Sequence, residues 1–156
     1  MIKQIWMRQI IGLALSVVLL GASSVSVHAA SHDCKAIGGM ALADAIDETN
    51  LVAALSGELG GGARAKITGQ EETATGLSLD MEHYFINDKA GLLRTRDKAT
   101  LTTVPGKHQT YMLEITYDVV EARGTYAGYK GRFRSFGLIN LATGKVVLRY
   151  NGEICK

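Results

Sequence analysis

The chain has 156 residues, with 17 basic and 15 acidic side chains and a formal net charge of +2. Nucleic-acid-binding domains usually carry a clear excess of basic residues, so this nearly neutral chain disfavours nucleic acid as a partner. Hydrophobic residues make up 47% of the sequence, which is typical of a globular chain with one hydrophobic core.

Residues 1–29 have the order of features that characterises a secretory signal peptide. Lys3 and Arg8 precede an apolar run at residues 10–20, and small residues follow up to Ala29. The run is shorter than the roughly 20 residues that a membrane-spanning helix needs. We therefore expect cleavage after Ala29, export to the periplasm or the extracellular medium, and no stable membrane span. A retained membrane anchor is the alternative.

Two cysteines stand near the ends of the expected mature chain, Cys34 and Cys155. In an oxidising compartment an even number of cysteines predicts a disulfide, and two free thiols are the alternative. The bond would close a loop of about 120 residues and contribute roughly 4–5 kcal/mol in the chain-entropy description. No histidine or further cysteine lies beside either one at ligand spacing, so the sequence predicts no metal site.

Residues 30–50 form an N-terminal segment whose spacing favours a short helix. Leu42 and Ile46 are four residues apart, and Asp44 and Asp47 fall on the opposite side of a helix. The stretch is short and rich in alanine. We expect one or two helical turns within residues 36–50.

Residues 51–156 have the pattern of β-strands. Two weak strands surround the glycines at 60–62, and from Gly76 onward hydrophobic and polar residues alternate. Turn-forming pairs separate the runs: Asn87-Asp88, Pro105-Gly106 and Thr143-Gly144. About eight strands with short connections predict an all-β fold, an antiparallel barrel whose closure removes exposed edges.

Four polar residues occupy strand faces that are otherwise mostly apolar, and they are our candidates for ligand binding. They are His83, Asp97, Tyr111 and Tyr117. If these faces point inward, the four side chains come from three successive strands and could meet in one cavity. His83 could act as an acid or base near neutral pH, and Asp97 could orient it or bind a hydroxyl group. The tyrosines could donate to a ligand oxygen.

A structural role for the same residues is the alternative. Buried tyrosines commonly donate to backbone carbonyls, and a buried aspartate needs a partner because an unpaired charge is costly. Arg96 and Arg149 could pair with Asp97, and His83 could lie at the barrel rim.

The sequence contains no motif for a catalytic nucleophile or a cofactor. It lacks Gly-x-Ser-x-Gly, and the glycines at 60–62 lack the following Lys-Ser/Thr of a phosphate-binding loop. The segment 123–134 interleaves basic and aromatic residues. Such a segment is most simply a solvated outer face, and docking to an anionic glycan or lipid headgroup is the alternative.

Residues 73–155 resemble a group of small exported bacterial proteins that look like the allene oxide cyclase barrel, which dirigent proteins share. The resemblance depends on "LLRTRDKATLTTVPG", on a glycine- and aromatic-rich strand "GTYAGYKGRFRSFG", and on the closing "LRYNGEIC". It implies eight antiparallel strands around an apolar interior. No catalytic residue of those families can be aligned with a position of this chain.

Three functions follow as hypotheses. The first is a binding module for a small apolar or aromatic ligand. The second is a structural or protein-interacting barrel with a filled interior, because small eight-stranded barrels are often only wide enough for their own side chains. The third, implied by the resemblance, is an isomerase or cyclase like allene oxide cyclase. Interior volume separates the first two, since ligand pockets usually measure about 300 Å³ or more.

Overall fold

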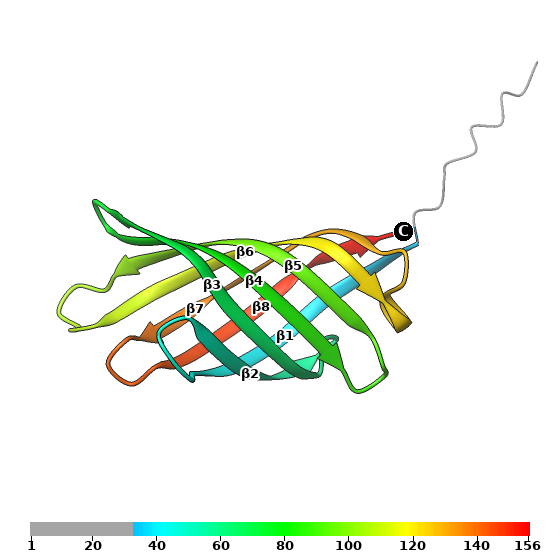
Figure 1. Ribbon diagram of the computed structural model, residues 1–156, viewed down its shortest axis with the longest axis horizontal. Coiled ribbons are helices and arrows are strands. Elements are labelled where there is room, and N and C mark those ends of the chain that lie inside the picture. Colours follow the sequence, from blue (N-terminus) through cyan, green and yellow to red (C-terminus); the bar gives the residue numbers. More distant parts are fainter. Residues whose placement is uncertain (1–32) are drawn as a thin grey trace, which may run out of the picture. The chain divides into compact units, whose positions relative to one another are not determined.

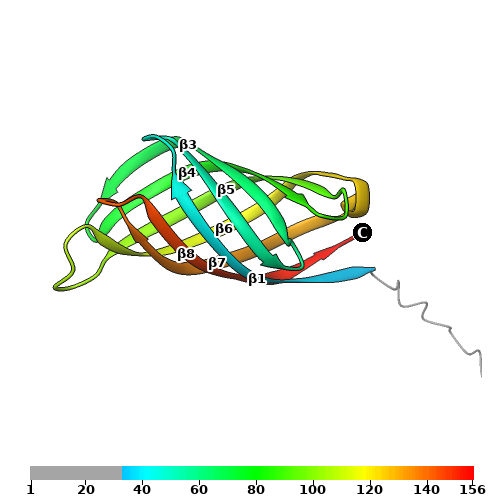
Figure 2. The ribbon, with the colours of Figure 1, turned by 90° about the horizontal axis from the view of Figure 1, so that it is seen from below.

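The computed structural model describes residues 33–156, and the expected signal peptide lies outside them. The described residues form one closed antiparallel barrel in which the strands follow one another in sequence order (Figures 1 and 2). The eight strands are β1 (Cys34–Ala45), β2 (Asn50–Gly57), β3 (Gly61–Thr73), β4 (Gly76–Asn87), β5 (Leu92–Thr103), β6 (Thr110–Arg123), β7 (Lys130–Asn140) and β8 (Lys145–Cys155). The all-β prediction and the expected number of strands are confirmed.

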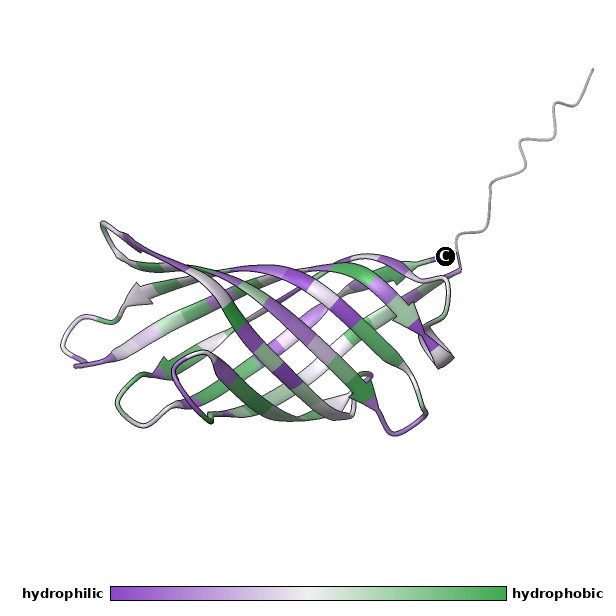
Figure 3. Ribbon diagram, in the orientation of Figure 1, coloured by the Kyte–Doolittle hydropathy of each residue, from purple (hydrophilic) through white to green (hydrophobic). Residues whose placement is uncertain are grey.

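Alternation along the strands places one face of each strand in the core and the other in solvent. Figure 3 shows hydrophilic and hydrophobic residues following one another along the ribbons. In β4 the buried side chains include Met81, His83 and Phe85, and the intervening Tyr84 is exposed. The alternation that the sequence shows from Gly76 onward corresponds to alternating burial along β4, β5 and β6.

The expectation of a short helix within residues 36–50 is wrong for the described residues. Residues 34–45 form β1, which belongs to the barrel, and residues 46–49 connect it to β2. Leu42 and Ile46, whose spacing suggested a helix, are both exposed, at 59% and 63%. The interior is reached instead by Ile37 and Ala41, which alternate as strand residues do.

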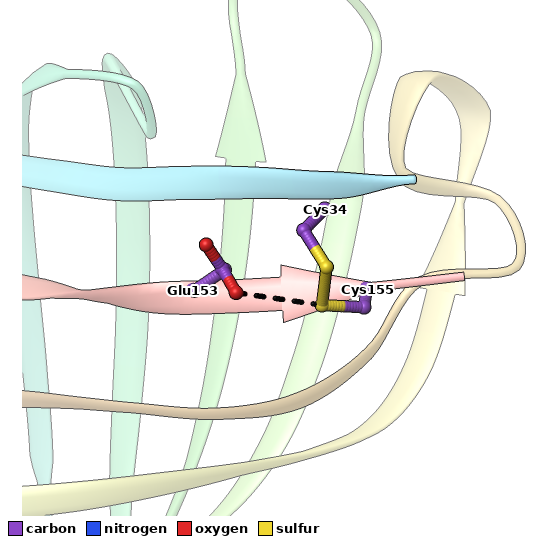
Figure 4. Close-up of side chains that lie close together, drawn as sticks. All are labelled: Cys34, Glu153 and Cys155. Atoms are coloured by element: carbon purple, nitrogen blue, oxygen red, sulfur yellow. Dashed lines mark hydrogen bonds between the residues drawn. A yellow bond between two sulfur atoms is a disulfide. The ribbon is translucent and has the colours of Figure 1, made fainter. Parts of the chain in front are cut away.

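The disulfide between Cys34 and Cys155 is confirmed. β1 and β8 pair to close the barrel, and the two cysteines are register partners in that pairing. The bond therefore joins the first residue of β1 to the last residue of β8, where the two strands close the barrel. Figure 4 shows it bridging the start of β1 and the end of β8.

Two glycines of β7 and β8 permit a close approach between these neighbouring strands. A Cβ atom on Gly137 would lie 1.9 Å from the carbonyl oxygen of Val147. Gly152 has a φ of +153° and faces Phe133 of β7 so closely that a Cβ would lie 2.6 Å from the Phe133 Cβ. These positions need glycine because the neighbouring strand leaves no space for a side chain.

The barrel has two unlike ends, which we name by their connections. The loop end carries the connections 46–49, 74–75, 104–109 and 141–144. The terminal end carries the connections 58–60, 88–91 and 124–129 together with the start of β1 and the end of β8. The 3₁₀ helix η1 (Gly124–Tyr126) belongs to the terminal end. Within residues 33–156, no helix has the length and hydrophobicity required to cross a bilayer.

Candidate functional site

A buried histidine–aspartate pair lies inside the barrel. His83 Nδ1 of β4 is 2.7 Å from Asp97 Oδ2 of β5. The hairpin register places His83 opposite Thr95 and Met81 opposite Asp97, so the paired residues are diagonal neighbours on the inner face. The Asp97 side chain is fully buried and the His83 side chain retains 10% exposure. Neither Arg96 nor Arg149 pairs with Asp97, because both side chains point outward.

Aromatic rings surround the histidine. The His83 ring stacks on Phe85, with ring centroids 5.4 Å apart, and meets the Tyr117 ring edge-on at 5.1 Å. Tyr117 in turn stacks on Phe133 at 4.5 Å. Contacts of this kind stabilise ring packing beyond the area that they bury. They hold the imidazole in one orientation.

Tyr117 is fixed by a hydrogen bond to Ser135, whose Oγ lies 2.8 Å from the Tyr117 Oη. Burial is the main cause that raises the pKa of the Tyr117 hydroxyl well above its usual value of 10.0, and the nearby Asp97 carboxylate acts in the same direction. The tyrosine therefore stays protonated at neutral pH and can donate a hydrogen bond.

One oxygen of the pair and one oxygen beside it have no hydrogen-bond partner among the described residues. These are Asp97 Oδ1 and Thr95 Oγ1, and both residues are almost completely buried. His83 Nε2 likewise makes no hydrogen bond with residues 33–156. Buried polar atoms normally have a hydrogen-bond partner. The unpaired atoms at the His83–Asp97 pair are therefore candidates for hydrogen bonds to a bound molecule.

The pair lies beside an apolar cavity. The space between the interior side chains measures about 720 Å³ when its open mouth is included, but only about 60 Å³ can hold the centre of a water molecule. His83, Phe85, Tyr117 and Ser135 line it together with hydrophobic residues. The part of the lining contributed by β1, β2 and β3 includes five small side chains: Ala41, Ala43, Ala53, Ala63 and Ala65. The cavity exists because these alanines face inward.

The cavity is blocked toward the terminal end. Tyr126 is 1% exposed there, and its hydroxyl donates to the Glu58 carbonyl at 2.8 Å and accepts from Asn87 at 3.0 Å. The backbone N–H of buried Leu59 donates to the Tyr150 hydroxyl at 3.2 Å. Half-buried lining residues lie toward the loop end (Ala43, Leu51 and Ile67) and also on β2 and β3 nearer the terminal end (Leu55 and Ala63).

The structure brings together three of the four candidate residues. His83, Asp97 and Tyr117 meet beside the cavity, whereas Tyr111 is half-buried near the loop end and does not line it. Ser135 and Phe133 belong to the site and were not among the candidates. The alternation in "RFRSFG" would have placed both on the inner face of β7.

The pair has defined chemical capabilities. An ionised Asp97 accepts a hydrogen bond from His83 Nδ1, which leaves Nε2 of a neutral imidazole as the acceptor. A base oriented in this way can bind a hydroxyl group or remove a proton from a molecule in the cavity. Among residues 33–156, no Asp, Glu, Lys or Arg side chain lines the cavity.

A second cluster of ligand-type atoms lies at the terminal end. Cys34, Cys155 and Glu153 place one sulfur or oxygen atom each within 4.8 Å of one another (Figure 4). The two sulfurs are bonded to each other, so they offer no thiolates, which are the form of cysteine that binds metals. This cluster is not a metal site in the oxidised protein.

These features define a small disulfide-closed barrel with a buried histidine–aspartate pair beside an apolar cavity. When the chain is compared with protein-family models, curated proteins and solved structures, none of them matches it.

Proposed function

We propose that the barrel binds a small, mainly apolar molecule that carries one hydrogen-bonding group. The proposal depends on one observation: His83, which is paired with the buried Asp97, lines a cavity whose other walls are almost entirely hydrophobic. Binding pockets usually combine apolar walls with a few placed polar groups. In our proposal His83 Nε2 receives the polar group of the ligand, Asp97 holds the imidazole through Nδ1, and the alanine side chains of the lining accommodate the apolar part.

The volume limits the size of this molecule. A free volume of about 60 Å³ accommodates only a slim end of the ligand. In our proposal the rest of the molecule lies among half-buried lining residues such as Leu51 and Ile67. Short-chain alcohols and simple phenols have the required combination of one hydroxyl group and an apolar body. We propose these as the ligand class, bound within an exported protein whose disulfide fits an oxidising compartment.

Titration followed by NMR tests the proposal, with 1-hexanol and p-cresol as probes. We expect chemical-shift changes at His83 and along β2 and β3, and we expect the variant Ala53→Leu to lose them because the larger side chain fills the cavity. Ala54→Leu is the matched control, since Ala54 neighbours Ala53 but faces outward. Absence of shift changes with both probes would contradict the proposal.

A structural or protein-interacting barrel with a filled interior is the second candidate function. The observation in its favour is the same cavity, because about 60 Å³ is well below the roughly 300 Å³ of common ligand pockets. Native mass spectrometry of the protein purified from its own compartment separates the candidates. A bound small molecule supports the first candidate, and a protein of unmodified mass that co-purifies with another protein supports the second.

The resemblance to allene oxide cyclase adds an isomerase or cyclase as a third proposal. A base held by a carboxylate inside an apolar cavity is suited to proton transfer. Replacement of His83 by Gln would then abolish turnover of a bound substrate while the barrel stays folded. Unchanged turnover in this variant would exclude His83 as the base.

A further inference from the structure

Few polar side chains line the interior cavity. Among residues 33–156, four lining residues carry a side-chain nitrogen or oxygen atom: His83, Tyr117, Ser135 and Tyr150. Each hydroxyl group has one proton to donate and two lone pairs, whereas a neutral imidazole has one donor and one acceptor nitrogen. The hydrogen bonds that these four side chains already make therefore determine which donors and acceptors are left for a ligand.

Tyr150 uses its only proton within the barrel. Its hydroxyl group donates to the carbonyl oxygen of Ser56 and accepts from the backbone N–H of Leu59. A ligand that accepted a hydrogen bond from Tyr150 would have to replace the Ser56 carbonyl. Tyr150 is therefore committed to the fold, and three polar residues of the lining remain.

His83 offers the ligand one acceptor. Its Nδ1 lies 2.7 Å from Asp97 Oδ2, and an ionised carboxylate can only accept, so Nδ1 carries the proton of a neutral ring. Nε2 then has a lone pair and no proton, and it makes no hydrogen bond within residues 33–156. This nitrogen requires a donor from a bound molecule.

Tyr117 and Ser135 together offer the ligand one donor. Their hydroxyl oxygens lie 2.8 Å apart, and both residues are buried. The two groups have two protons between them, and the bond that joins them uses one. Within the described part of the chain, neither hydroxyl group makes a second side-chain hydrogen bond. One proton of the pair therefore remains available beside the cavity.

The chemistry of the two hydroxyl groups indicates which of them keeps the available proton. A phenol donates more strongly and accepts more weakly than an aliphatic alcohol, because its oxygen lone pair is delocalised into the ring. This difference favours Tyr117 as the donor and Ser135 as the acceptor of the bond between them. The proton of Ser135, whose side chain lines the cavity, is then free for a ligand.

We propose that Ser135 is a specificity-determining residue of the interior site and that it donates to the hydroxyl oxygen of the ligand. The ligand O–H donates in turn to His83 Nε2, and His83 Nδ1 donates to Asp97. Tyr117 adjoins both sides of the ligand position, since it bonds to Ser135 and meets the His83 ring edge-on at 5.1 Å. The bound hydroxyl group completes a chain in which every donor points the same way, and such hydrogen bonds polarise one another.

This chain selects the chemical class of the ligand. A hydroxyl group donates and accepts at one atom, so it satisfies Ser135 and His83 together. A ketone or an ether only accepts and leaves Nε2 without a partner, and an ammonium group only donates. Sites that bond to a ligand hydroxyl group reject analogues that lack it, because the polar groups of the site are then left unpaired. The inference rests on the proposed function and adds the residue that distinguishes alcohols and phenols from other small apolar molecules.

NMR titrations of the purified protein with p-cresol and toluene test the role of Ser135, because toluene has the same ring and methyl group without the hydroxyl group. Ser135→Ala should weaken p-cresol binding by about tenfold and leave toluene binding nearly unchanged. A merely structural role of Ser135 would weaken both ligands alike. Tyr117→Phe should weaken p-cresol binding less than Ser135→Ala does, since Ser135 then keeps its free proton. Thr100→Ala, which removes an exposed hydroxyl group of β5, is the matched control and should bind both ligands as the wild type does.

A third ligand keeps the test decisive if Ser135→Ala does not fold, which near-ultraviolet circular dichroism would reveal. 4-Methylanisole accepts but cannot donate, so it should bind to the wild-type protein more weakly than p-cresol does. Equal affinity for these two ligands, equal p-cresol binding by wild type and Ser135→Ala, or a larger loss in Tyr117→Phe than in Ser135→Ala would each overturn the inference and leave the proposed function intact. A wild-type protein that binds neither p-cresol nor toluene would overturn both.

Discussion

His83 Nδ1 lies 2.7 Å from Asp97 Oδ2, and both residues are buried inside the barrel. The hydrogen bond crosses two adjacent strands diagonally, from β4 to β5. A buried charge of this kind is stable only with its partner, because desolvation of an isolated carboxylate is costly. The pair is therefore sensitive to changes in either residue.

Removing one partner should be strongly destabilising. We expect Asp97→Ala to lower the free energy of unfolding by about 3–5 kcal/mol, since it leaves His83 buried and unpaired. Asp97→Asn should cost less, because an amide oxygen can still accept from Nδ1. Urea denaturation of the two variants measures the difference. Equal losses in both variants would show that the hydrogen bond does not determine the stability.

Replacing both partners by apolar residues should restore much of that loss. In the double variant His83→Met and Asp97→Leu no polar group is left unpaired, and buried ion pairs can often be replaced by well-packed hydrophobic residues without loss of stability. We expect the double variant to be more stable than Asp97→Ala in the same denaturation assay. Such a result would indicate that the pair is retained for binding or chemistry. A double variant less stable than Asp97→Ala would assign it a structural role.

The disulfide at the seam between β1 and β8 should contribute substantially to stability. Cys34 and Cys155 are separated by 121 residues, and the chain-entropy description assigns a loop of this length roughly 4–5 kcal/mol. We expect the variant with serine at both positions to show this loss in urea denaturation. Wild-type protein under reducing conditions should behave like the variant, and a difference between the two would indicate that serine itself perturbs the seam.

Stability should fall at alkaline pH. Burial raises the pKa values of Tyr117, Tyr126 and Tyr150 above the usual 10.0. The folded barrel therefore keeps these protons when the unfolded chain has lost them, so the free energy of unfolding decreases as pH rises above 10. Tyrosinate absorbance should appear together with the unfolding transition. Tyr117→Phe should weaken this pH dependence, while at neutral pH it costs about 1 kcal/mol for the bond to Ser135.

The connection between β1 and β2 should respond to acid. The side chain of Asn50 and the backbone N–H of Thr49 donate to Asp47 and lower the pKa of its carboxyl group from 3.8 to about 2. The ionised form stabilises this connection at pH values above 3.8, and the stabilisation is lost as the pH falls toward 2. Carbon NMR of the carboxyl group measures the pKa directly. An Asp47 that titrates near 3.8 would contradict these hydrogen bonds.

The sequence determined the class of fold, because strand periodicity is a local property. Alternation of apolar and polar residues from Gly76 to Cys155 specifies which face of each strand is buried, whatever the partner strand is. It also placed His83, Asp97 and Tyr117 on the mostly apolar faces of their strands, and the two cysteines, Cys34 and Cys155, predicted the bond between them.

Only the tertiary structure decided how these faces meet. β1 pairs with β8, at the far end of the sequence, and this non-local pairing overrides the helical spacing of Leu42 and Ile46. The contact between His83 and Asp97 depends on strand register, which a one-residue slip would destroy. Cavity volume depends on how the alanine side chains of the lining and the aromatic rings fill the interior. Periodicity assigns a side chain to a face, but register and packing are collective properties of all eight strands.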